Sequence, residues 1–217
     1  MQLLLNFLMM LSALAGFIYG GLLYIGPKKP LYATMIVYGV GCIALGRMYQ
    51  CARLVTGLPV DNIFQLGILG TIGAFAFFFS ANFGQIDSLV DDGGKEFARY
   101  RRIALIGPLV IAVMYAAAFP RLLFVERIFD ALVAATIAEA SYFHIKHLLI
   151  PDVDYGVVSC LRGYNAIVLF YGVLCMAEII ASSYGIIVVQ ALISVLLCIV
   201  SALIVPAMDK GVKKWTT

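Results

Sequence analysis

Three charged side chains, Arg47, Glu139 and Glu178, lie inside long apolar stretches of the sequence. A charge at the centre of a lipid bilayer costs about 2.5–3.5 kcal/mol, so each is a candidate functional residue if its stretch crosses a membrane. Arg47 and Glu178 are expected at similar depth and could form a purely structural ion pair. In the functional alternative, Glu139 and Glu178 line a polar cavity and bind a cation, a proton or a substrate amine.

The two histidines, His144 and His147, are three residues apart and therefore share one face of a helix. Glu139 precedes His144 by five residues and falls on the adjoining strip. Two histidines with an acidic partner could bind a divalent metal ion. In the alternative interpretation, both histidines lie beside Lys146 at the cytoplasmic boundary of the membrane and are solvated.

A row of polar side chains follows the third apolar stretch, in "SANFGQIDSLVDDGGKEFARYRR". Asn82 and Gln85 place amide groups where they could bind a polar solute at the cytoplasmic mouth of a helix bundle. Asp87 and Asp91 are four residues apart, and carboxylates at this spacing could hold Mg²⁺ and, through it, a diphosphate. With His147, these two aspartates are the metal-ligand candidates of the sequence.

The acidic pair, with arginines downstream, resembles the motif of integral membrane prenyl- and phospho-alcohol transferases. The resemblance implies a Mg²⁺-dependent transferase in which Asp87 and Asp91 hold the ion. The sequence departs from those families, because no second acidic motif follows and "DDGGKEFAR" misses their spacing. The alternative is an amphipathic cytoplasmic connection over residues 86–102 with solvated charges, which could also dock a protein partner.

The composition places the chain in a membrane. Hydrophobic residues make up 63% of the 217 residues and charged residues 12%, against about 45–50% and about 25% in soluble domains. The mean hydropathy is +1.01, and no soluble fold of this size could bury so much apolar surface. We therefore expect an integral membrane protein in contact with lipid.

The same composition excludes several functional classes. The net charge of +3 is small and dispersed, which argues against nucleic acid as a partner. The five cysteines include no C-x-x-C pair, which leaves a structural zinc site without support. The sequence has no G-x-S-x-G, H-E-x-x-H or P-loop motif, and its last apolar stretch has no lysine for a retinal Schiff base. No catalytic residue and no cofactor are therefore predicted.

Seven apolar stretches predict an all-α fold with seven transmembrane helices in one domain over residues 1–217. Each is about 17–25 residues long, enough to cross a hydrocarbon core about 30 Å thick. Unpaired backbone groups are too costly in lipid, so the stretches must be helical. They cover roughly 3–26, 31–52, 63–85, 103–120, 128–149, 162–182 and 184–207.

The basic residues predict that the N-terminus lies outside and the C-terminus in the cytoplasm. In this orientation, 11 of the 15 Lys and Arg residues are cytoplasmic, and only Arg47, Arg53, Arg121 and Arg127 lie on the outer side. The expected location is the plasma (inner) membrane.

The sequence also contains a possible internal repeat. "YGVGCIA" at 38–44 and "YGVLCMA" at 171–177 agree at five of seven positions, either by chance or because three helices were duplicated around a linker helix. A 3+1+3 plan of parallel repeats resembles the architecture of the SWEET sugar transporters and their PQ-loop relatives. The Pro-Gln dipeptide of the latter is absent here.

These patterns favour a small-solute transporter or facilitator whose polar cavity binds a small polar solute or a cation. Its expected binding residues are Arg47, Asn82, Gln85, Glu139, His144 and Glu178. The alternative is a receptor-like sensing module, or a membrane subunit that acts through a protein partner at residues 86–102. A Mg²⁺-dependent membrane transferase is the third hypothesis.

Overall fold

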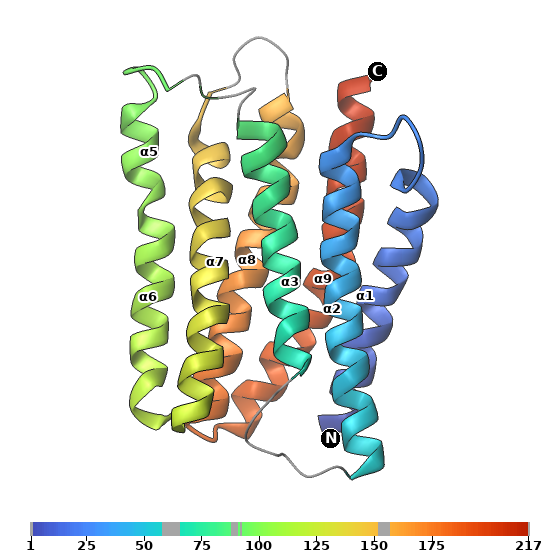
Figure 1. Cartoon of the computed structure of the whole chain (residues 1–217), viewed down its shortest axis with the longest axis vertical. Coiled ribbons are helices and arrows are strands. Elements are labelled where there is room, and N and C mark those ends of the chain that lie inside the picture. The colour runs from blue at the N-terminus through green and yellow to red at the C-terminus, as the bar shows by residue number, and fades with distance from the viewer. Residues whose placement is uncertain (1, 58–65, 88–90, 92, 152–156, 217) are drawn as a thin grey trace.

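The computed structural model describes residues 2–57, 66–87, 91, 93–151 and 157–216, and this part of the chain is entirely helical apart from its connections (Figure 1). The long helices are α1 (Gln2–Tyr24), α2 (Leu31–Thr56), α3 (Leu66–Ala81), α7 (Phe124–Leu149), α8 (Val157–Ser183) and α9 (Ile187–Thr216). The shorter elements are η1 (Asn82–Asp87), α5 (Ala98–Ala104), α6 (Ile106–Ala118) and η2 (Phe119–Arg121). The described residues contain seven spans long and apolar enough to cross a membrane, as the sequence predicts.

The fourth span, Ala98–Arg121, consists of α5, α6 and η2 and is interrupted at Leu105. Pro108 explains the interruption, because proline has no N–H to donate to the carbonyl of Ala104 one turn earlier. The span begins at Ala98, whereas the sequence prediction began at 103. The arginines that suggested a loop are thus part of the helix.

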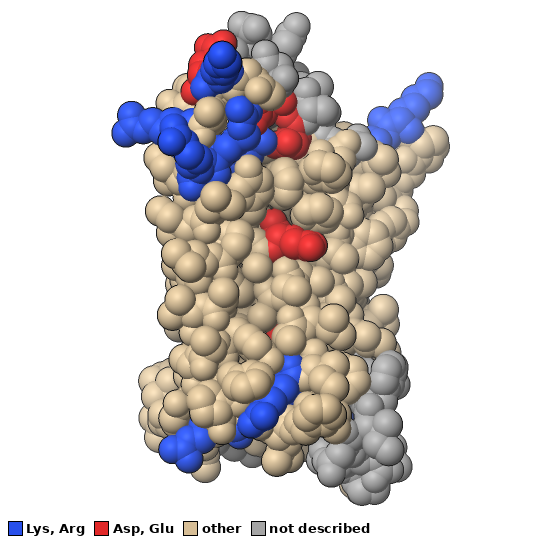
Figure 2. Space-filling model, turned by 60° about the vertical axis from the view of Figure 1, so that its left-hand side comes forward, with Lys and Arg blue, Asp and Glu red and all other residues tan. Residues whose placement is uncertain are grey.

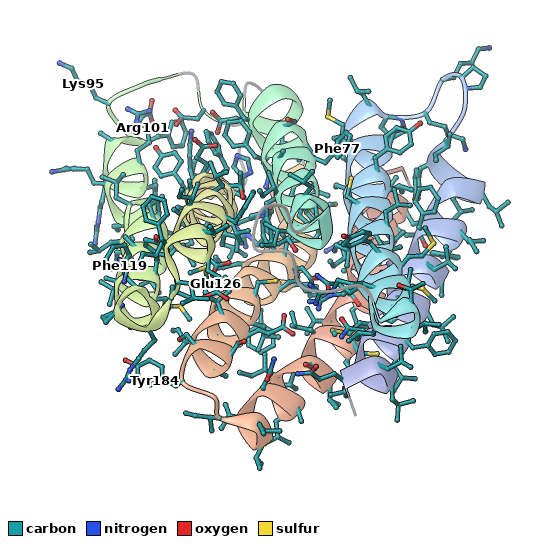
Figure 3. The ribbon with its side chains drawn as sticks, turned by 60° about the horizontal axis from the view of Figure 1, so that its bottom comes forward. Phe77, Lys95, Arg101, Phe119, Glu126 and Tyr184 are labelled. Atoms are coloured by element: carbon teal, nitrogen blue, oxygen red, sulfur yellow. The ribbon has the colours of Figure 1, made fainter. Side chains whose placement is uncertain are left out.

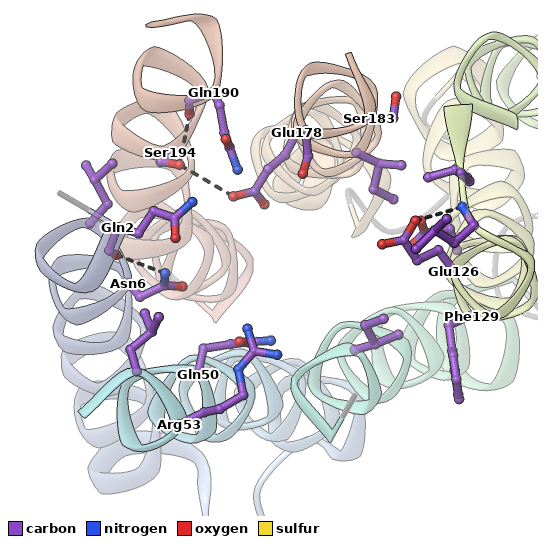
Figure 4. Close-up of a pocket in the computed structure, with 18 of the residues that line it drawn as sticks. Gln2, Asn6, Gln50, Arg53, Glu126, Phe129, Glu178, Ser183, Gln190 and Ser194 are labelled. Atoms are coloured by element: carbon purple, nitrogen blue, oxygen red, sulfur yellow. Dashed lines mark hydrogen bonds between the residues drawn. The ribbon is translucent and has the colours of Figure 1, made fainter. Parts of the chain in front are cut away.

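Six helices form a ring, and the seventh span lies outside it. Around the ring the packing order is α1, α2, α3, α7, α8 and α9, and α9 returns to α1. Figure 4 looks into the ring from one end and shows helices on every side of a pocket. Helix α6 packs against the outer side of α7 and α8 (Figure 1).

Glycines allow α2 and α3 to approach closely, as small residues commonly do where membrane helices pack. A Cβ added to Gly70 would lie 2.6 Å from the carbonyl oxygen of Cys42, and one added to Gly46 would lie 2.8 Å from that of Gly67. Helix α1 also packs closely against α2, since a Cβ on Gly20 would lie 2.5 Å from a methyl group of Val37.

Charged side chains gather mainly at the two ends of the bundle (Figure 2), and many large hydrophobic side chains are exposed on its surface. One end carries the C-terminus and the connection between α1 and α2, and the N-terminus lies at the other end (Figure 1). Figure 3 shows Lys95 and Arg101 at the end opposite to Glu126 and Tyr184. This distribution is that of a bundle with an apolar belt of membrane thickness.

The two seven-residue motifs lie on α2 and α8, and their glycines face different neighbours. A Cβ on Gly39 would meet Phe78 of α3 at 2.5 Å, whereas a Cβ on Gly172 would meet Ile137 of α7 at 2.9 Å and Phe75 of α3 at 3.3 Å. The internal repeat stays a prediction.

Candidate functional site

A cleft of about 1180 Å³ opens at the end of the bundle that carries the N-terminus. All six helices of the ring contribute to its wall. Figure 4 shows that polar side chains from α1, α2, α8 and α9 project into it. They include Gln2, Asn6, Gln50, Ser183, Gln190 and Ser194. In a chain with only 12% charged residues, such a concentration of hydrogen-bonding groups inside the bundle is a candidate binding site.

Arg47 of α2 and Glu178 of α8 form an ion pair in this cleft, with 2.9 Å between Nη2 and Oε2. The pairing expected from the sequence is therefore present. Arg47 Nη1 also donates to Asn6 Oδ1 at 3.2 Å, and Ser194 Oγ donates to Glu178 Oε1 at 3.4 Å. The two charged side chains are 16% and 20% exposed. Both charges are thus shielded from lipid and still accessible from the cleft, where they could bind a small polar solute.

Sequence reasoning missed several polar groups of the cleft, among them Asn6, Gln50 and Ser194. The signal for them was weak: each is a single uncharged residue in an apolar stretch, and serine is common in membrane helices. Only the packing of α1, α2 and α9 around one opening brings them together.

Large buried side chains fill the bundle beyond the ion pair. Phe75 of α3 stacks on Tyr171 of α8 with ring centroids 6.0 Å apart, and Phe78 meets the edge of Tyr164 at 6.4 Å. All four are at most 2% exposed. Tyr171 precedes Glu178 by about 10 Å along α8. We call these four residues the aromatic layer.

A second polar region lies on the other side of the aromatic layer, and its amide and imidazole groups are buried. Asn82 begins η1, a π-helical turn at the end of α3, and such turns are frequent at functional sites. Its side-chain amide lies 2.9 Å from His144 Nδ1 and donates to Asn165 Oδ1 at 3.1 Å, and His144 Nδ1 lies 2.8 Å from the same oxygen. Residues from α7, α8 and η1 thus meet at one point.

His147 connects this amide network to charged groups. Its Nδ1 lies 3.3 Å from Asn82 Oδ1 and its Nε2 lies 3.1 Å from Asp87 Oδ1. Lys146 Nζ lies between two carboxylates, 2.6 Å from Asp87 and 2.7 Å from Asp91. Arg101 Nη1 contacts the other oxygen of Asp91 at 2.7 Å.

We call these eight residues, Asn82, Asp87, Asp91, Arg101, His144, Lys146, His147 and Asn165, the polar cluster. The surrounding charges set the acidity of its two aspartates. Burial alone would raise the pKa of Asp87, but hydrogen bonds from His147 and Lys146 outweigh it and hold that pKa below its usual value. For Asp91, burial is likewise outweighed by Lys146, the backbone N–H of Gly93 and Arg101, so its pKa is also lowered. Both carboxylates are therefore ionised at neutral pH, and the cluster is held together by charge.

Three buried polar atoms, two of them in the polar cluster and one beside it, make no hydrogen bond within the described part of the chain: His144 Nε2, Asn165 Nδ2 and the Tyr164 hydroxyl. The rings of His144 and Tyr164 are 5.6 Å apart. Leaving a buried polar atom unpaired costs about 1–3 kcal/mol. The contact between α7 and α8 at this level is thus incompletely satisfied.

The structure divides the sequence candidates between these places. Arg47 and Glu178 lie in the cleft, and Asn82, His144, Asp87, Asp91 and His147 lie in the cluster. Both histidines are buried, 1% and 0% exposed, so the interpretation as solvated residues is wrong.

Two candidates stand apart from both places. Glu139 is exposed on the outer face of α7 and belongs to neither region. The backbone of Gln85 lies in η1, but its side chain is outside the described part of the chain.

The metal candidates do not form a recognisable metal site. Where ligand oxygens of Asp87 and Asp91 would meet a cation, the ammonium group of Lys146 contacts both. Among the residues that the structure describes, no group of three His, Cys, Asp or Glu side chains could hold a metal ion.

Comparisons of the chain with protein-family models, with curated proteins and with solved structures found no match. The functional argument therefore depends on the cleft and the polar cluster themselves.

Proposed function

We propose that the chain is a small-solute transporter or facilitator whose solute enters the cleft and contacts Arg47 and Glu178. The observation that carries the proposal is the cleft, a polar space of about 1180 Å³ among six helices with an accessible ion pair inside. A site built only for stability would gain more from apolar side chains, since an ion pair in low-dielectric surroundings does little for stability.

In the proposed orientation the cleft opens to the outside and the C-terminus is cytoplasmic, in a plasma (inner) membrane. The support is the unequal distribution of basic residues along the sequence, because positive charge favours the cytoplasmic side. The described arginines at the cleft end are Arg47, Arg53, Arg121 and Arg127, and most Lys and Arg residues belong to the helix ends and connections at the other end.

The polar cluster serves as the cytoplasmic gate in this proposal. Its histidines, asparagines and lysine are buried, and it joins η1, α5, α7 and α8 through ion pairs and hydrogen bonds. A second arrangement of α7 and α8 would open it and could pair His144 Nε2 and Asn165 Nδ2, which lack partners here. The unpaired atoms lower the cost of leaving the closed state, as a gate requires.

The 3+1+3 repeat would suit such a mechanism, because two halves could rock about a common site. The order of the ring allows it, with α1, α2 and α3 corresponding to α7, α8 and α9. The different neighbours of Gly39 and Gly172 speak against close equivalence, so the proposal does not depend on the repeat.

Uptake by purified protein in liposomes tests the proposal. We would measure uptake of a panel of radiolabelled amino acids, sugars, polyols and polyamines, relative to liposomes without protein. For the solute that enters, we expect Arg47→Gln and Glu178→Gln each to lower the initial rate at least tenfold, because each leaves the other charge unpaired in the cleft. Glu139→Gln is the matched control: it also removes a carboxylate but lies outside the cleft, and should retain the wild-type rate.

Two results would refute the proposal. One is that no solute of the panel crosses faster than in protein-free liposomes. The other is that Glu139→Gln abolishes uptake while both changes in the cleft leave it intact.

A further inference from the structure

Glu139 is a charged residue in the middle of a membrane-length helix that the proposed transport cycle does not use. Its side chain is exposed on α7, and within the described residues it makes no ion pair or hydrogen bond. The next residues on the same side, Ala135 and Leu132, are exposed as well. Glu139 is thus a carboxylate on the outer surface of the bundle, with apolar neighbours along its helix.

Its depth makes this exposure costly. Helix α7 continues for about 22 Å before Glu139 and for about 15 Å after it, which puts the carboxylate well inside a hydrocarbon core about 30 Å thick. Figure 2 shows that the charged surface otherwise gathers mainly at the ends of the bundle. A carboxylate at this depth needs a proton, a distortion of the bilayer or a partner.

The residues around Glu139 form a surface suited to another helix. Exposed Ile128, Leu132, Ala135 and Glu139 follow one another at spacings of four, three and four. A stripe with this spacing runs along one side of a helix and interlocks with a partner helix, and the small side chain of Ala135 permits a close approach. The stripe is part of α7, which packs against α3, α5, α6 and α8.

We propose that this stripe binds a transmembrane helix of a different protein that carries a lysine or arginine at the depth of Glu139. Charge complementarity selects the partner, because an ion pair in lipid lowers the cost that each charge has there when it is unpaired. A second copy of the chain does not fit. Among the described residues, the exposed basic side chains, such as Lys95, Arg121 and Arg162, lie near helix ends or in connections.

Site-specific photocrosslinking in the native membrane tests the inference. A photoreactive amino acid at Leu132 would probe the stripe, and one at Val113, which is 61% exposed on α6, would probe another apolar surface as a matched control. We expect an adduct from Leu132 but not from Val113. Mass spectrometry should identify in it a membrane helix with a lysine or arginine about 10 Å from the crosslinked depth, at the depth of Glu139.

Charge reversal then decides whether Glu139 selects the partner. Glu139→Gln should lower the adduct yield at least tenfold, while the purified variant keeps the elution volume of the wild type. Glu139→Lys should abolish the adduct, and changing the partner's basic residue to glutamate should restore it. The inference is overturned by no adduct, by an adduct with a second copy of the chain or with a helix without a basic residue, by a yield that Glu139→Gln leaves unchanged, or by failed restoration. Because uptake by purified protein does not require the partner, this failure is distinguishable from failure of the transport proposal.

Discussion

Replacing Lys146 by methionine tests whether charge holds the polar cluster together. The side chain is 4% exposed and its ammonium contacts both Asp87 and Asp91. Removing one partner of a buried ion pair costs about 3–5 kcal/mol. Here Asp87 keeps His147 and Asp91 keeps Arg101, so we expect the lower limit, about 3 kcal/mol. For a chain of this length each kcal/mol shifts the melting temperature by about 2–4 °C, which predicts a decrease of about 6–12 °C.

Thermal unfolding in one detergent at pH 7 would measure this decrease. Lys95→Met is the matched control, because Lys95 is exposed and its loss should change stability by at most about 0.5 kcal/mol. Adding Asp87→Asn and Asp91→Asn to Lys146→Met should recover most of the loss, because no carboxylate is then left without its cation. A triple variant no more stable than Lys146→Met would refute the electrostatic reasoning and assign the effect to packing.

Three further predictions concern pH, helix packing and the contact between α1 and α9. The pKa values of Asp87 and Asp91 are lowered in the folded protein. Their contribution to stability is therefore complete above about pH 3.9, the pKa of unfolded aspartate, and is lost as the pH falls below it. A melting temperature that stays constant from pH 5 to pH 3 would contradict this. Gly70→Val should lower the free energy of unfolding by about 1–3 kcal/mol, because the new side chain overpacks α2 against α3. Gly163→Ala is the control, because a Cβ there meets nothing within 4 Å and should not lower the melting temperature. Equal melting temperatures of the two variants would count against the packing argument. Asp209→Asn should lower stability by about 1–3 kcal/mol, measured in the same assay, because Asp209 pairs with a lysine and accepts hydrogen bonds from two tyrosines; an unchanged melting temperature would show that these contacts are replaced by water.

The sequence was sufficient for the number and approximate position of the helices, because hydrophobicity over about 20 residues is a signal independent of packing. Details of the backbone were harder to predict. Helix α9 continues past Pro206 to Thr216, although proline removes one helical hydrogen bond. Likewise, the third stretch ends as α3 at Ala81 and continues as the π-helical turn η1.

The direction of a polar side chain could be predicted only where the sequence also contained a residue of opposite charge at a similar depth. Arg47 and Glu178 have opposite charges at the same depth, so their pairing followed from the topology. Glu139 has a known depth, but lipid and the interior of the bundle are both apolar, so no polar face indicates which side of the helix is exposed. The burial of His144 depends on Asn82 and Asn165, which are 62 and 21 residues away from it in the sequence.

The geometry of α8 links the two polar regions. Glu178 in the cleft and Asn165 in the cluster are on this one helix, about 20 Å apart, with Tyr171 of the aromatic layer between them. A helix transmits a tilt or rotation along its whole length, so a solute that displaces Glu178 from Arg47 would also move Asn165 relative to His144. In the proposed transport cycle, opening the cluster would cost several kcal/mol if the Lys146 ion pairs break, which would keep the open state rare without solute. Solute binding shifts this equilibrium only by the difference between its affinities for the two states. The contacts with Arg47 and Glu178 must therefore be stronger when α8 has moved, and this requirement is what would make transport depend on the solute.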